Sequence, residues 1–259
     1  MLKRKLAQMS ISFHNLILKR YNLRLELVPQ GRIMTRSMRY DTIDESTLRK
    51  KFESYEDYTR YRTLELVTAE IRNKYNQEEL SNCCIAEAGV FKGWFAWIIN
   101  EKFPECEMFL YDTFDGFDKG DLEIEVSRSF TREGNLGEYT GHFGKTIETP
   151  EERIEAVKSK LKYIDKCHIR KGYFPDTANG EKDKRWVLVS LDMDLYKPMK
   201  EGLFFFWPNM VEGGFIFVHD YNNKDFAGIK KAISELEQEY GRIYKVPISD
   251  EGGTIILCK

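Results

Sequence analysis

The sequence predicts an α/β fold with a mostly parallel sheet of seven strands and an antiparallel last strand. Short apolar runs alternate with helical patterns from residue 83 onward, which is typical of parallel strands joined by helices. The strongest run, Val187–Leu191, is bounded like a buried parallel strand and ends at Asp192 and Asp194. The chain closes on two short apolar runs around the turn Asp250–Gly253, which predicts an antiparallel pair.

The expected elements follow one another in order along the chain. Strands are expected at residues 83–86, 108–111, 168–171, 186–191, 215–218, 244–247 and 254–258. Apolar spacing predicts helices at residues 1–25, 46–74, 93–101, 150–164, 198–210 and 228–240. The polar, irregular stretch Gln30–Asp44 predicts a linker, and Gly213 with Gly214 predicts a turn before the fifth strand.

The length of 259 residues favours one domain with an appendage over two full domains. We expect a basic N-terminal arm at residues 1–45 and the main domain at residues 46–259. Residues 116–149 are charged, contain glycine and show little periodicity. A loop region of this length is uncommon unless it forms a lid or a substrate-binding insertion, so we predict such an insertion there.

Charge is unevenly distributed along the chain. Residues 1–39 carry a net charge of +8, although the whole chain carries −2. Such an arm can contact a membrane surface peripherally, a nucleic acid or an anionic substrate. A solvated helix face or an oligomer contact explains basic arms more often, so we expect a homo-oligomer and no nucleic-acid partner.

Targeting and cysteine patterns predict a cytoplasmic protein. No apolar run approaches the roughly 20 residues that a membrane span needs, and polar residues interrupt the apolar stretch near the N-terminus. No small-residue cleavage site follows that stretch, which excludes a signal peptide. The cysteines are odd in number and lack framework or metal-site spacing, so we expect reduced thiols. They are Cys83, Cys84, Cys106, Cys167 and Cys258.

The first strand leads into a turn that can bind a nucleoside. Glu87 is followed by Gly89 and Gly93, which open a helix. Glycines let the backbone approach a ligand closely, and a helix N-terminus favours a carboxylate or phosphate. A tight strand-to-helix turn with no ligand is the alternative. Asp112 ends the second strand, where an acid typically accepts hydrogen bonds from ribose hydroxyls, so Glu87 and Asp112 together favour a nucleoside ligand.

The fourth and fifth strands end in side chains that suit a metal ion. Asp192 and Asp194 follow the fourth strand, while His219 and Asp220 follow the fifth. These strands are neighbours in a doubly wound sheet, so their terminal side chains can converge. Carboxylates suit a hard cation such as Mg²⁺, and His219 can ligate, act as a base or bond a carboxylate. Alternatively, Asp192 only caps the next helix, which has Pro198 in its first turn.

Six motifs occur in an order that is similar to the macrocin O-methyltransferase family. They are EAGVFKG (87–93), YDTFDGF (111–117), KGYFPDT (171–177), LDMDLYKP (191–198), GGFIFVHDY (213–221) and FAGIKKAI (226–233). The resemblance covers about residues 50–257 and implies a Rossmann-like class I methyltransferase fold. It also implies S-adenosylmethionine and Mg²⁺ as cofactors and a sugar hydroxyl as methyl acceptor.

The resemblance also implies roles for individual residues. Glu87, Gly89 and Gly93 would face the methionine and ribose parts of the cofactor, and Asp112 would hold the ribose. The remaining predicted cofactor-binding residues are Thr113, Phe174 and Asp176.

Asp192, His219 and Asp220 match the metal-ligand positions, and Asp194 matches the family's second acid. The catalytic residues are therefore expected among Asp192, Asp194 and His219. The family usually has Asp-Asp-Tyr where this chain has His219-Asp220-Tyr221. Imidazole ligates Mg²⁺ less readily than carboxylate does, which leaves open a softer metal, a rearranged site or reduced metal dependence. His142 and Tyr221 are candidate contacts to the acceptor.

We therefore expect an S-adenosylmethionine-dependent O-methyltransferase that acts on a small-molecule or glycan hydroxyl, in glycan or natural-product biosynthesis. One alternative is a nicotinamide-dependent oxidoreductase, although the G-x-x-x-G spacing at Gly89 and Gly93 differs from the dinucleotide fingerprint. The other alternative is a non-catalytic module that the basic arm recruits to a membrane or polymer.

Overall fold

The computed structural model describes residues 23–27, 33–37, 57–131, 149–250 and 252–259. The chain divides into two compact units, residues 1–58 and residues 59–259. In the first unit, β1 (Leu23–Leu27) and β2 (Ile33–Ser37) form an antiparallel pair.

These two strands correct the sequence prediction of a helix at residues 1–25 and a linker at Gln30–Asp44. The sequence LRLEL of β1 alternates apolar and charged residues with a period of two, which fits a strand. The rest of the predicted first helix, residues 1–22, lies outside the described residues.

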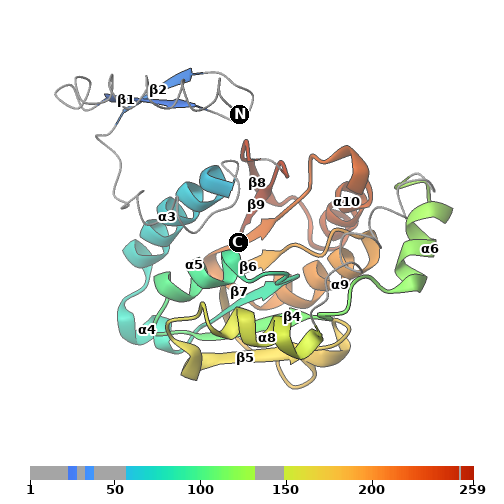
Figure 1. Ribbon diagram of the computed structural model, residues 1–259, viewed down its shortest axis with the longest axis horizontal. Helices are drawn as coiled ribbons and strands as arrows, with labels where there is room; N and C mark the ends of the chain where they lie inside the picture. The colour runs from blue at the N-terminus through green and yellow to red at the C-terminus, as the bar shows by residue number, and fades with distance from the viewer. Residues whose placement is uncertain (1–22, 28–32, 38–56, 132–148, 251) are drawn as a thin grey trace. The chain divides into compact units, whose positions relative to one another are not determined.

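The second unit is built on a seven-stranded sheet with the order β5-β4-β3-β6-β7-β9-β8 (Figure 1). All neighbours run parallel except β9, which is antiparallel to both β7 and β8. The strands are β3 (Cys84–Ala88), β4 (Glu107–Asp112), β5 (Cys167–Lys171), β6 (Trp186–Leu191), β7 (Met210–Val218), β8 (Tyr244–Pro247) and β9 (Ile255–Cys258). The predicted mostly parallel sheet with an antiparallel last strand is confirmed.

The α-helices of the described chain are α3 (Asp57–Lys74), α4 (Gln77–Ser81), α5 (Trp94–Lys102), α6 (Lys119–Ser127), α8 (Pro150–Lys158), α9 (Tyr196–Phe206) and α10 (Gly228–Tyr240). Helix α6 lies inside the predicted insertion, where the sequence showed little periodicity. Helix α8 ends at Lys158, before the predicted end at residue 164. Among the described residues, no helix combines the length and apolar character that crossing a membrane requires.

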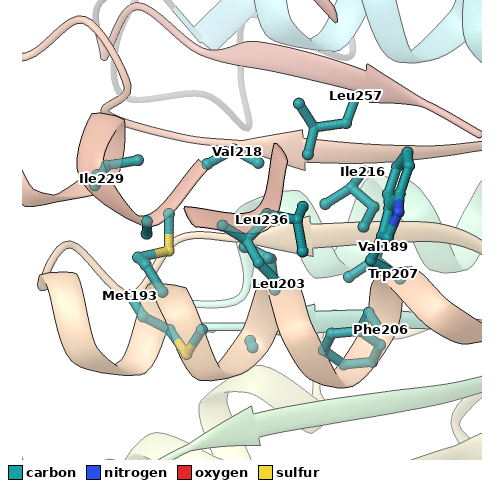
Figure 2. Close-up of a cluster of buried hydrophobic side chains, with 14 of the residues drawn as sticks. Val189, Met193, Leu203, Phe206, Trp207, Ile216, Val218, Ile229, Leu236 and Leu257 are labelled. Atoms are coloured by element: carbon teal, nitrogen blue, oxygen red, sulfur yellow. The ribbon is translucent and has the colours of Figure 1, made fainter. Parts of the chain in front are cut away.

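Helices pack on both faces of the sheet because successive side chains of a strand point in opposite directions. On one face, Leu203 of α9 and Leu236 of α10 join Ile216 of β7 in the main hydrophobic cluster (Figure 2). On the other face, the ring of Phe217 lies 5.7 Å from that of Phe95 in α5. The sheet is therefore buried on both sides, as parallel sheets usually are.

Strand β7 begins earlier than predicted and contains a bulge. Trp186 of β6 pairs with Met210, but Leu188 pairs with Phe215, so β7 carries extra residues within its ladder. Gly213, with a φ of +76°, lies in this bulge. The prediction of a turn before the fifth strand is wrong because the glycines bend a continuous strand.

Two strand ends meet closely at the centre of the sheet. Gly89 follows β3 with a φ of +85°, and an ideal Cβ there would lie 1.9 Å from the carbonyl oxygen of Asp192. The N–H of Asp192 donates to the carbonyl oxygen of Ala88 at 2.8 Å. Only glycine therefore fits at position 89, since a side chain would collide with the backbone that follows β6.

Replacing this glycine should separate the cost of backbone conformation from the cost of collision. Gly180 has a φ of +94° and no atom within 4 Å of an ideal Cβ, so Gly180→Ala carries the conformational cost alone. We expect Gly180→Ala to lower the free energy of unfolding by about 1 kcal/mol and Gly89→Ala by about 3 kcal/mol or more. If urea denaturation shows that the two variants lose the same free energy of unfolding, the close approach of Gly89 and Asp192 is contradicted.

Candidate active site

Strand β3 carries an unusual buried carboxyl group close to its carboxyl end. Glu87 is only 2% exposed, and its Oε2 atom has no hydrogen-bond partner among the described residues. Its carboxyl group accepts a hydrogen bond from the backbone of Ala96 in α5. Burial, together with the nearby carboxylate of Asp192, raises the pKa of Glu87 well above its usual range. A buried acceptor without a partner suits a ligand that brings its own donor.

Asp112, at the end of β4, ties two loops together. Its Oδ2 atom accepts hydrogen bonds from the N–H groups of Val90 and Phe91 at 2.7 and 2.9 Å. Its Oδ1 atom accepts another from the N–H of Phe114 at 2.6 Å. Asp112 thus acts as a turn former and also holds the glycine turn in place, and its contact with a ribose stays a prediction.

Three predicted metal-site residues converge where β6 and β7 end side by side. Nδ1 of His219 lies 2.8 Å from Oδ1 of Asp192 and 2.7 Å from Oδ2 of Asp220. One candidate ligand atom from each residue lies within 4.8 Å of the others. The register brings them together, because Leu191 and Val218 are paired at the ends of the two strands.

A fourth member of this cluster comes from helix α3 and was not predicted. Nη1 of Arg60 lies 3.0 Å from Oδ2 of Asp192, although the two residues are 132 positions apart. The guanidinium carbon stands 4.5 Å from the centre of the Phe95 ring. No sequence signal distinguishes Arg60 from Arg62 or Arg72 in the same helix, because only the packing of α3 brings it to the site.

Electrostatics shift the pKa values of Asp192, His219 and Asp194 in different ways. Burial opposes ionisation of Asp192, but His219 and Arg60 outweigh it and hold the pKa of Asp192 below its usual value. Burial also opposes charging of His219, yet Asp192 and Asp220 raise the pKa of His219 to about 10. Burial and both neighbouring carboxylates raise the pKa of Asp194, which shares a hydrogen bond with Asp220.

The alternative interpretation of Asp192 as a helix cap is wrong. Helix α9 begins at Tyr196, and Leu195 at its N-cap makes no side-chain cap hydrogen bond. Instead, the buried carboxylate of Glu125 in α6 accepts the N–H of Tyr196. Asp194 stands between the strand and this helix with a φ of +60°, a conformation that is uncommon for a residue other than glycine.

The other predicted cofactor residues lie in different surroundings. Thr113 donates its hydroxyl to the carbonyl oxygen of Gly116 at 2.7 Å. Phe174 is buried in the hydrophobic core, where its ring stacks on Phe206 at 5.7 Å. Asp176 is exposed at the start of a short 3-10 helix. Their contacts with a cofactor stay predictions.

Of the two predicted acceptor contacts, the structure describes one. Tyr221 directly follows the cluster, and Nζ of Lys230 lies 5.3 Å from the centre of its ring. His142 lies outside the described residues.

The donor set fits a divalent cation. Two carboxylates and one imidazole converge at a single point. A bound cation would displace the extra proton that the raised pKa of His219 otherwise retains, and the set would then offer hard oxygen ligands and one nitrogen. An ideal Cβ at Gly252 would lie 2.3 Å from Nε2 of His219, so the backbone covers that nitrogen and Nδ1 faces the carboxylates. The turn at Gly89 and the unpartnered oxygen of Glu87 likewise fit a ligand that lies against the end of β3.

Comparison with known proteins places this chain in a family. The family described as Macrocin-O-methyltransferase (TylF) matches residues 37–248. The calicheamicin methyltransferase CalS11 is 15% identical, over 85% of this chain and 87% of its own, with a TM-score of 0.59. The O-methyltransferase NovP is 16% identical, over 76% of this chain and 79% of its own, with a TM-score of 0.58. No protein with a curated description matches the sequence.

The two structural matches establish the Rossmann-like methyltransferase fold, which confirms the predicted fold class. Nothing in the comparisons supports a nicotinamide oxidoreductase or a non-catalytic module. Because the family match spans most of the chain, including all six motifs, the chain belongs to the macrocin O-methyltransferase family and is an S-adenosylmethionine-dependent O-methyltransferase.

Proposed function

We propose that this enzyme methylates a sugar hydroxyl on a small molecule in natural-product biosynthesis, with assistance from a divalent cation. Membership of the macrocin O-methyltransferase family supports the substrate class. One structural observation carries the proposal: the cluster of Asp192, His219 and Asp220 lies directly beside the glycine turn after β3. A methyl donor bound at that turn and an acceptor bound at the cluster would be neighbours, which is what in-line transfer requires.

The cofactor half of the site would be formed by the ends of β3 and β4. Gly89 and Gly93 leave room for the backbone to approach the methionine and ribose parts of S-adenosylmethionine. Glu87 offers a buried acceptor, and Asp112 would hold the ribose while it keeps the turn in shape. The sulfonium of the cofactor is already a good leaving group, so positioning by these residues should supply much of the acceleration.

The acceptor half would be formed by the ends of β6 and β7. Asp192, His219 and Asp220 would hold the cation, and Mg²⁺ is the first candidate because carboxylates dominate the set. A cation bound there would supply Lewis acidity that lowers the pKa of the acceptor hydroxyl. His219 replaces a carboxylate of the family pattern, so a softer ion such as Mn²⁺ is the second candidate.

Asp194 is the acid that remains available as a base. It does not belong to the three-residue cluster, yet it shares a hydrogen bond with Asp220 and so stands beside it. Its raised pKa means that it holds a proton in the unliganded site. A cation bound beside it would lower that pKa and leave a carboxylate able to take the proton of the acceptor hydroxyl. Tyr221 and His142 are proposed to contact the acceptor.

Removing one ligand should abolish turnover without affecting the cofactor. We expect Asp220→Ala to lose more than about 99% of methyl transfer, because acceptor activation needs that carboxylate. Its affinity for S-adenosylhomocysteine, measured by calorimetry, should change less than about two-fold. Asp183→Asn, an exposed acid before β6, is the matched control and should retain activity. Parallel loss of cofactor affinity would contradict the role assigned to Asp220.

Replacing Asp112, by contrast, should weaken binding of the cofactor. Asp112→Asn should weaken S-adenosylhomocysteine binding at least ten-fold, because both the ribose contact and the support of Val90 and Phe91 depend on the carboxylate. Asp115→Asn changes an exposed acid of the same loop and should leave affinity unchanged. Unaltered binding by the Asp112 variant, measured by calorimetry, would rule out its proposed contact.

The acceptor class can be tested directly. The purified chain is incubated with labelled S-adenosylmethionine, Mg²⁺ or Mn²⁺, and a panel of glycosylated small molecules with their matching aglycones. We expect a methyl group on the sugar, located by mass spectrometry of the fragments. Transfer to aglycones alone, or equal rates after complete removal of divalent cations, would overturn the proposal.

Several expectations about the whole molecule also stay proposals. We propose a cytoplasmic homo-oligomer that meets no nucleic acid. The predicted boundary between residues 45 and 46, the lid at residues 116–149 and the membrane contact of residues 1–39 belong to the same proposal. Residues 132–148 and most of the arm lie outside the described residues.

A further inference from the structure

Arg60 makes a contact with the proposed metal site that catalysis does not obviously require. Its Nη1 atom lies 3.0 Å from Oδ2 of Asp192, and its side chain is only 10% exposed. The other oxygen of Asp192, Oδ1, lies 2.8 Å from Nδ1 of His219. Each oxygen of this carboxylate therefore has its own partner.

The position of Arg60 is restrained by more than the ion pair. Its guanidinium stands 4.5 Å from the centre of the Phe95 ring, and Phe95 is itself buried in α5. A planar guanidinium that stacks on an aromatic ring and bonds a carboxylate is held in both distance and orientation. Arg60 cannot lose its charge under ordinary conditions, so the positive charge beside Asp192 is permanent.

Such a contact has two consequences for a cation. A carboxylate with one oxygen committed to arginine can offer only the other oxygen as a ligand. A fixed positive charge behind that carboxylate also repels a cation in front of it, across surroundings less polar than water. The first effect limits the number of ligand atoms, and the second weakens the binding of the ion.

We propose that Arg60 is a positioning residue that clamps Asp192 as a one-oxygen ligand and keeps the cation loosely bound. The inference rests on the proposed metal site and adds a residue to it. With one atom each from Asp192, His219 and Asp220, half of the positions of an octahedral ion stay open for acceptor oxygens and water. Without the clamp, Asp192 would bind through both oxygens and fill one of those positions.

Arg72 provides a matched control on the same helix. Its Nη1 atom lies 2.7 Å from Oε1 of Glu105, and its guanidinium carbon is 5.6 Å from the centre of the Phe103 ring. The arrangement repeats the arginine, carboxylate and phenylalanine combination of Arg60, but Glu105 lies just before the start of β4, away from the carboxyl ends of the strands. Replacing Arg72 should reproduce any effect on the protein that comes from losing such a contact in general.

The test is a Mn²⁺ titration of the full-length protein, followed by calorimetry and by the electron paramagnetic resonance of free Mn²⁺. The proteins are the wild type, Arg60→Gln, Arg60→Met, Arg60→Lys and Arg72→Gln. We expect both neutral Arg60 variants to bind one Mn²⁺ about ten-fold more tightly than the wild type. Arg60→Lys keeps the charge, so its affinity for Mn²⁺ should lie closer to that of the wild type. The affinity of Arg72→Gln should equal that of the wild type.

A gain in affinity cannot result from partial unfolding, so it separates the clamp from a merely structural role. Arg60→Met keeps an unbranched stem against Phe95 if the glutamine variant proves unstable. Unchanged or weaker Mn²⁺ binding by the neutral variants, beside normal binding by the wild type, would overturn the clamp alone. Absence of Mn²⁺ binding in every protein would instead overturn the proposed metal site, and the clamp with it.

Discussion

The close approach of Gly89 and Asp192 is the constraint on which the rest of the site depends. A Cβ at position 89 would lie 1.9 Å from the carbonyl oxygen of Asp192, so the turn after β3 and the loop after β6 touch through their backbones. The hydrogen bond from Asp192 to Ala88 sets the same contact from the other side. A ligand held by one loop is therefore held at a fixed distance from the side chains of the other, which suits group transfer between two bound molecules.

The acidic cluster can be buried only because basic side chains from other parts of the chain pair with it. Asp192 follows β6, and its two oxygens are paired with Arg60 of α3 and with His219, which follows β7. Buried charges are expensive unless they are paired, and a further acid beside the pair, Asp194, shares a hydrogen bond with Asp220 instead. The site thus combines three acids with two basic side chains, and this balance would set how strongly the proposed metal site attracts a cation.

The helix inside the predicted insertion is tied to the same loop. Glu125 of α6 accepts the N–H of Tyr196, two residues beyond Asp194. Asp121 of α6 accepts the hydroxyl of Tyr173 at 2.8 Å and lies 3.2 Å from Nζ of Lys197. Helix α6 therefore rests on the segment that carries the proposed base, which connects the region expected to select the acceptor with the region expected to activate it.

The sequence by itself determined the strands of the seven-stranded sheet and most of the proposed site, because apolar runs ending in acids at Glu87, Asp112 and Asp192 can be recognised locally. Tertiary structure decided what local patterns do not encode. The bulge at Gly213 depends on pairing with β6, the cap of α9 comes from Glu125 in a different helix, and Arg60 reaches Asp192 across 132 positions. Each of these contacts joins residues far apart in the chain, so only the packed fold defines them.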